Sequence, residues 1–164
     1  MCKDNAVSDL VGEKLDERHA AEALAVAEAD TGARPEFAML APDESSTRSG
    51  CGYVLLLEFP ETAPDAAGLA RRWADVVEGE LCRNYHYSHA RRLGQLGAVR
   101  PVLLRNGLQA YRHARESGGA RSGTLKIPAL ARGAPGQPAW WLSACRTETP
   151  AGDGGLSGKA AKAL

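Results

Sequence analysis

The feature that most constrains the fold is a nearly continuous apolar run, GYVLLLEF, at Gly52–Phe59. A strand that is apolar on both faces must be covered on both faces, so this run predicts a central strand of a sheet with helices packed on it. A second strand-like segment, EFAMLA at Glu36–Ala41, precedes it across a polar turn at Pro42–Gly50. Two strands joined by one short connection favour a hairpin.

Three further segments have the spacing of helices with one apolar side. The first begins at Asp16 and is stopped by Gly32, the second spans Pro64–Arg83, and the third spans Leu108–Ser117. Apolar residues recur in each of them with the helical period. The expected inward residues are Ala20, Ala23, Leu24 and Ala27 in the first helix, Leu69, Trp73, Val76, Val77 and Leu81 in the second, and Leu108, Tyr111 and Ala114 in the third.

The remaining elements are shorter. Val99–Arg105 reads as a strand, and Pro101 within it favours a sheet edge or a bulge, because proline has no N–H for a sheet ladder. Asn5–Val11 and Lys126–Pro128 are expected to be extended, and Asn84–Gly97 to be a polar, aromatic connection. The resulting order, β-α-β-β-α-β plus a further helix, resembles ferredoxin-like folds. The expected class is α/β (α+β), with a single mixed or antiparallel sheet of about four strands and helices packed on it.

Composition excludes several classes of protein. Of 164 residues, 44% are hydrophobic and 24% are charged, which is typical of a folded domain. The 20 basic residues balance 20 acidic residues, so no overall charge draws the chain to nucleic acid or to a membrane surface. No apolar run has the roughly 18 residues of a membrane span, and the N-terminus lacks the apolar core of a secretory signal. Four cysteines without a Cys-x-x-Cys pair favour reduced thiols and a cytoplasmic location.

The body of the chain is expected to end near residue 131. Residues 132–164 are rich in glycine, proline and alanine without a regular period, so we expect a poorly ordered tail. Trp140 and Trp141 are adjacent within it. Because exposed tryptophan is unfavourable, this pair is expected to dock either on the chain's own sheet or on a partner.

A possible metal site involves Cys82, His86 and His89, which lie within eight residues. Thiolate and imidazole are zinc ligands, but a structural zinc site needs four well-spaced ligands and no fourth lies nearby. The favoured interpretation is a buried cysteine at a helix end followed by two loop histidines. No metal site is therefore expected.

A basic and aromatic stretch comprises Tyr85, Tyr87, Arg91–Arg92 and Arg100. Such residues can bind single-stranded nucleic acid, but the aromatic strand motif of RNA-recognition domains is absent. The alternative is a loop held by bonds from arginine to carboxylates or carbonyls. We expect no nucleic-acid partner.

A glycine-rich stretch, GGARSGTLK at Gly118–Lys126, does not fit a nucleotide-binding loop. Such a loop needs lysine directly after its last glycine, at the start of a helix. Here Lys126 follows Gly123 by three residues and leads into Ile127-Pro128. Lys126 is thus either a solvated surface residue or a mobile cation delivered to an anion that another domain holds.

Three stretches together resemble a known family. They are VSDLVGEKLDE at Val7–Glu17, NYHYSHARRLGQLG at Asn84–Gly97 leading into the predicted strand, and Ala110–Pro128 with its GGARSGTLKIP end. In this order and spacing they resemble the C-terminal domain of the Gretchen Hagen family, the auxin-responsive acyl-acid amido synthetases and their bacterial relatives. The resemblance covers residues 4–131.

This resemblance implies an adenylate-forming ligase. In the family, a carboxylic acid reacts with ATP and magnesium to give an acyl-adenylate, and the amine of an amino acid then displaces AMP. ATP and the acid bind mainly to a large N-terminal domain, while the small C-terminal domain swings on a hinge and caps the site. Lys126 matches the lysine of the family's Gly-x-Tyr-Lys-x-Pro-Arg segment, and Lys14 matches a hinge-side lysine. Residues 1–15 are then hinge-like, and residues 16–131 form the lid.

The function implied is therefore that of a detached lid domain that is inactive alone. Its partner would be the large adenylating domain, missing or separately encoded, which would hold most of the contacts to ATP and magnesium. The alternative is a stand-alone ferredoxin-like module with a binding or regulatory role and no catalysis, and a further one is a non-functional remnant. The carboxylic acid and the amino acid stay open.

Overall fold

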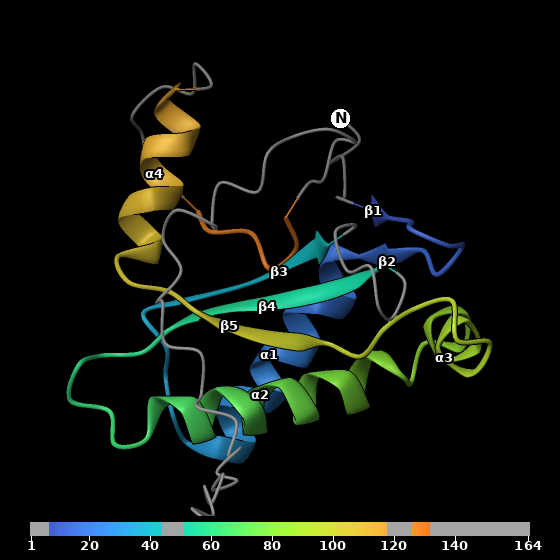
Figure 1. Ribbon diagram of the computed structural model, residues 1–164, viewed down its shortest axis with the longest axis horizontal. Coiled ribbons are helices and arrows are strands. Elements are labelled where there is room, and N and C mark those ends of the chain that lie inside the picture. Colours follow the sequence, from blue (N-terminus) through green and yellow to red (C-terminus); the bar gives the residue numbers. More distant parts are fainter. Residues whose placement is uncertain (1–6, 44–50, 118–125, 132–164) are drawn as a thin grey trace, which may run out of the picture.

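A three-stranded sheet forms the centre of the molecule (Figure 1). The computed structural model describes residues 7–43, 51–117 and 126–131. The elements in chain order are β1 (Val7–Ser8), β2 (Leu15–Asp16), α1 (Glu17–Thr31), β3 (Phe37–Asp43), β4 (Gly52–Glu58), α2 (Ala66–Leu81), α3 (Tyr85–Arg92), β5 (Arg100–Leu103) and α4 (Gly107–Ser117).

The strand order of this sheet is β3-β4-β5. β4 pairs antiparallel with β3 and parallel with β5, and its residues from Gly52 to Leu57 are all buried. A short fourth piece lies beyond β3, where Leu40 N–H donates to the Ala129 carbonyl at 2.8 Å and Ala131 N–H donates to the Leu40 carbonyl at 2.7 Å. The central position of the Gly52–Phe59 run, the hairpin and the edge position of the proline-containing strand are confirmed.

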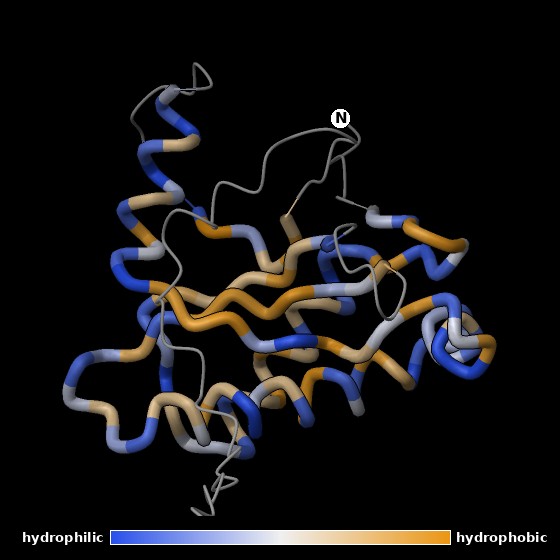
Figure 2. Tube along the Cα trace, viewed as in Figure 1, coloured by the Kyte–Doolittle hydropathy of each residue, from blue (hydrophilic) through white to orange (hydrophobic). Residues whose placement is uncertain are grey.

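Helices cover the sheet unequally. α1 and α2 lie together on one side, where the larger cluster of buried side chains includes Tyr53, Leu55 and Trp73 (Figure 1). On the other face, residues of β3 and β4 gather with Tyr111 of α4 in a second cluster. Figure 2 shows most of β4, the central strand, as a continuous apolar stretch. The α+β class with a mixed sheet is therefore confirmed.

The first helix is bounded as the sequence predicts. Asp16 is its N-cap and accepts a hydrogen bond from His19 N–H at 2.9 Å. Gly32 ends it in the left-handed conformation at φ 64°, with its N–H donating to the Glu28 carbonyl. Glycine adopts this conformation without the Cβ penalty, which explains the stop.

Two local differences from the expected elements concern short segments. Within the described part of this segment, residues 7–11, only Val7–Ser8 forms a strand, and it pairs with the unpredicted β2 in a separate ribbon instead of joining the sheet. The Asn84–Gly97 connection contains α3, which begins because the Asn84 side chain accepts from His86 N–H and Tyr87 N–H. The cap at Asn84 stabilises the start of α3 and so offsets the low helix propensity of the aromatic and histidine residues that follow.

Several expectations fall on residues outside the described ranges. These are the glycine-rich stretch before Lys126, the tail at 132–164 and its pair Trp140 and Trp141. In the described ranges, no helix has the length and apolarity needed to cross a membrane.

Candidate functional site

Lys126 opens the segment 126–131 that runs alongside β3. The parallel bridge between Leu40 and Leu130 fixes this segment to the sheet four residues after the lysine. The Lys126 side chain is exposed, and it forms no ion pair with the described residues. Its ammonium is therefore accessible to a ligand or partner while its backbone stays close to a fixed point.

Lys14 lies in the turn between β1 and β2 and is also exposed. Its backbone is left-handed at φ 48°, a conformation that is uncommon for residues other than glycine. Within the same turn Gly12 has φ 97°, and its N–H donates to Asp9 Oδ1 at 2.6 Å. The turn is thus a defined structure that presents one lysine to solvent.

The carboxylate of Glu13 anchors this turn. Glu13 is fully buried and accepts hydrogen bonds from Leu10 N–H at 2.9 Å and Val11 N–H at 2.8 Å. It also accepts from the hydroxyl of Tyr53, a residue of the central strand. Burial, followed by the bond to Glu13, raises the pKa of Tyr53, so this hydroxyl stays a donor. Because a buried carboxylate needs such donors, Glu13 ties the turn carrying Lys14 to the sheet.

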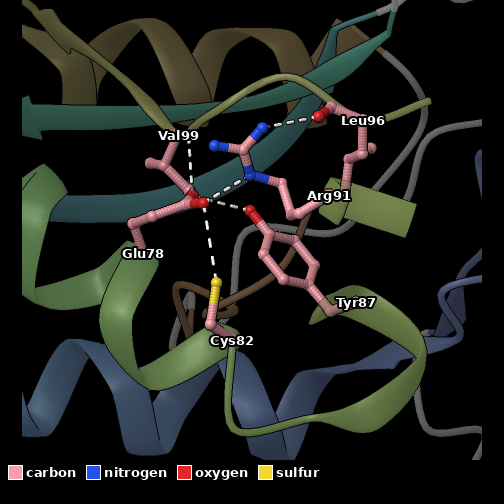
Figure 3. Close-up of polar contacts among 6 residues, drawn as sticks. All are labelled: Glu78, Cys82, Tyr87, Arg91, Leu96 and Val99. Atoms are coloured by element: carbon pink, nitrogen blue, oxygen red, sulfur yellow. Dashed lines mark hydrogen bonds and ion pairs between the residues drawn. The ribbon is translucent and has the colours of Figure 1, made fainter. Parts of the chain in front are cut away.

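The half-buried carboxylate of Glu78, in α2, joins three elements (Figure 3). It accepts hydrogen bonds from Tyr87 hydroxyl at 2.8 Å, Arg91 Nε at 2.5 Å and Val99 N–H at 2.9 Å. The Cys82 thiol lies 3.7 Å from it, and Arg91 Nη1 donates onward to the Leu96 carbonyl at 2.7 Å. Glu78 therefore holds α3 and the chain entering β5 against the end of α2.

Electrostatics stabilise this arrangement at neutral pH. Burial, and then the charge of Glu78, raises the pKa of both Cys82 and Tyr87, so both groups stay protonated donors. Burial disfavours the cationic form of Arg91, but its bond to Glu78 and the charge of Glu78 outweigh this effect and raise its pKa. The network is a stable ion pair surrounded by neutral donors.

The histidines and cysteine that raised the possibility of a metal site are engaged elsewhere. Cys82 contacts Glu78, while His89 stacks on Tyr85 with ring centroids 5.8 Å apart and His86 meets the same ring edge-on. No group of three or more His, Cys, Asp or Glu among the described residues could hold a metal ion.

The basic stretch is held largely by internal bonds. Arg91 is bound to Glu78 and to the Leu96 carbonyl, and Arg100 Nη2 donates to Asp43 Oδ2 at 2.6 Å. Tyr87 is fully buried, whereas Tyr85 is 66% exposed. The predicted arginine bonds to a carboxylate and a carbonyl are confirmed for Arg91, but the expectation of a loop is wrong, because Arg91 lies in α3.

Sequence reasoning missed Glu13 and Glu78. An isolated glutamate in a polar turn or on a helix is usually solvated, so neither position stands out. The one available signal was the position of Glu78 directly after Val77 on the apolar side of its helix, three residues before Leu81. For Glu13 only the packing of the turn against Tyr53 reveals the buried carboxylate.

The fold and the positions of the two lysines together describe the class of protein. It is a mixed α+β domain in which Lys14 and Lys126 are exposed and lie outside the helices and strands. The family model for the GH3 family C-terminal domain matches residues 18–134. The chain therefore belongs to the GH3 family through its C-terminal domain, as the resemblance predicted.

Solved structures agree with this fold. A "GH3.15 acyl acid amido synthetase" has a TM-score of 0.66 at 14% identity, covering 88% of this chain and 27% of that chain. The "AtGH3.15 acyl acid amido synthetase in complex with 2,4-DB" has a TM-score of 0.65 at 13% identity, covering 88% of this chain and 26% of that one. This chain thus spans about a quarter of the length of those synthetases. No curated protein matches the sequence.

Proposed function

We propose that this domain is the closing part of an ATP-dependent ligase that joins a carboxylic acid to an amino acid. It acts with a larger adenylating part, carried on the same polypeptide or on a separate one. The observation that carries the proposal is the family match over residues 18–134, which covers most of the described body. The synthetases of similar fold are matched over only 27% and 26% of their own length, which supports a division of labour between two parts.

Under this proposal the domain supplies one cation to the chemistry. Lys126 is exposed and lies next to the segment bridged to β3. A lysine ammonium is a mobile point charge that stabilises negative charge on phosphate oxygens. In a closed, water-poor site such a charge counts for far more than it does in solvent. Lys126 would therefore act during adenylation, when charge builds on the phosphates of ATP.

We assign most contacts to ATP and magnesium to the larger part, because the family resemblance places the binding of ATP and the acid mainly there. The domain would contribute Lys126, the exclusion of water, and the rigid turn with Lys14 on the hinge side.

The test is ATP–pyrophosphate exchange, which reports acyl-adenylate formation. The chain is assayed alone and then with its adenylating part, taken from the adjoining or neighbouring reading frame, against a panel of carboxylic acids that includes 2,4-DB. We expect no exchange from the chain alone and exchange from the combination. Strong exchange by the chain alone would contradict a closing role.

Lys126→Ala is expected to lower the exchange rate of the combination by about 100-fold, as removal of one charge-stabilising group does elsewhere. Arg112→Ala is the matched control, because Arg112 is another exposed cation on the outside of α4. An equal effect of the two substitutions would remove Lys126 from the site. No exchange under any condition, with both parts folded, would favour the stand-alone binding or regulatory module.

A further inference from the structure

The outer edge of β3 has an unpaired backbone position at Ala38. Leu40 directs both its N–H and its carbonyl outward: the N–H donates to the Ala129 carbonyl and the carbonyl accepts from Ala131 N–H. Backbone groups alternate along a strand, so those of Ala38 also face away from β4. Leu57, which lies opposite Ala38 on β4, supports this orientation. Its carbonyl accepts from Leu104 N–H, on the side of β4 that faces away from β3.

The bridge at Leu40 does not continue to Ala38. A continued parallel ladder needs bonds from Ala38 N–H to the Ile127 carbonyl and from Ala129 N–H to the Ala38 carbonyl, and neither is present. Further along the edge, Pro42 has no N–H to offer. Within the described residues, Ala38 therefore keeps an outward donor and an outward acceptor without backbone partners.

A cavity of about 430 Å³ lies at this position. It is bounded by α1, by the start of β3 and by the segment of Ile127 and Ala129, with Leu24 and Trp73 among its apolar lining. We call it the β3-edge groove. Its volume lies within the range of about 300–1,000 Å³ found for ligand-binding clefts. An apolar side chain and a short stretch of backbone can therefore share the space.

The charges at the groove favour a basic ligand. Glu28, Arg34 and Glu36 all line it. Arg34 Nε lies 3.7 Å from Glu28 Oε1, whereas Glu36 is exposed and forms no ion pair with the described residues. One carboxylate is thus left to attract a cation.

We propose that the β3-edge groove binds an extended peptide of another polypeptide by strand addition at Ala38. The carbonyl of the peptide's central residue accepts from Ala38 N–H and the N–H of the same residue donates to the Ala38 carbonyl, the antiparallel pattern by which sheet edges capture peptides. An apolar side chain of the peptide packs over Leu24 and Ile127, and a neighbouring lysine or arginine pairs with Glu36. This binding does not depend on the ligase function proposed above.

The test is a titration of the full ¹⁵N-labelled chain with an acetylated, amidated peptide, Lys-Val-Thr-Leu-Lys, followed by amide chemical shifts. We expect saturable shifts centred on Ala38 and Ile127, with a dissociation constant at or below about 1 mM. The same peptide N-methylated at its central residue, and the acidic peptide Glu-Val-Thr-Leu-Glu, are expected to bind at least about fivefold more weakly. Equal binding of all three peptides, or no shifts near Ala38, would overturn the proposal.

Substitutions in the protein test the same contacts that the peptide variants test. Ala38→Pro removes the outward N–H without removing a bond to β4, which an edge strand tolerates, and is expected to weaken binding about tenfold or more. Glu36→Lys should also weaken binding, whereas Glu61→Lys, the same charge change on an exposed residue outside the groove, should not. Far-UV circular dichroism checks the fold of each variant, and the N-methylated peptide keeps the test valid if Ala38→Pro does not fold.

Discussion

Glu78→Gln is expected to destabilise the domain far more than the same substitution two residues along the helix. The Glu78 side chain is 19% exposed and its partner Arg91 is 29% exposed. One carboxylate oxygen accepts from Tyr87 and Val99, and the other accepts from Arg91. An amide has a single oxygen, so it can keep the first pair of bonds only by turning its NH₂ group toward the guanidinium.

The magnitude follows from these bonds. Losing the bond to Arg91 costs about 1.5–3 kcal/mol, and the two remaining bonds weaken because their acceptor is no longer charged. The partial exposure of Arg91 lets water recover some of this loss. We therefore expect unfolding free energy to fall by about 2–4 kcal/mol, which lowers Tm by roughly 5–15 °C.

Urea unfolding of the full chain, followed by far-UV circular dichroism, measures this difference. Glu80→Gln is the matched control, because Glu80 pairs with Arg83, whose side chain is 77% exposed. That exposed pair should contribute less than about 0.5 kcal/mol. If the two variants differ by less than about 0.5 kcal/mol, the idea that Glu78 holds α3 and β5 against α2 is wrong.

Three further predictions use the same assay. Burial raises the pKa of Tyr53 and Tyr87 above the value of about 10 that holds in the unfolded chain. The folded state then binds more protons above pH 10, so stability should fall there by about 1.4 kcal/mol per pH unit for each tyrosine, and a flat profile would contradict this. Tyr53→Phe removes a donor from buried Glu13 and should cost about 1–3 kcal/mol. Asp16→Ala removes the cap of α1 and should cost about 1 kcal/mol, with the exposed Glu22→Ala as a near-neutral control.

Much of the fold follows from local pattern. The run at Gly52–Phe59 predicted the central strand because apolar residues on both faces leave no side for water. Pro101 predicted the edge strand, and Asp16 with Gly32 predicted both ends of α1. α3 was missed because its side chains are polar and aromatic, and only its cap and its bond to Glu78 reveal a helix. Ala38 could not be found either, since its neighbours on the strand look no different.

By itself, the sequence determined the longer strands and helices, though not β2 or α3, together with the α+β class and the family, because these depend on periodicity, caps and motifs that are local along the chain. It also singled out Lys126 and Lys14 through their motif context. The tertiary structure decided which carboxylates are buried and paired, which arginines are engaged, and which edge of β3 stays open. Those properties depend on pairs of residues that lie far apart in the sequence and approach each other only when the sheet forms. Glu13 and Tyr53 are 40 positions apart, and Asp43 and Arg100 are 57 positions apart.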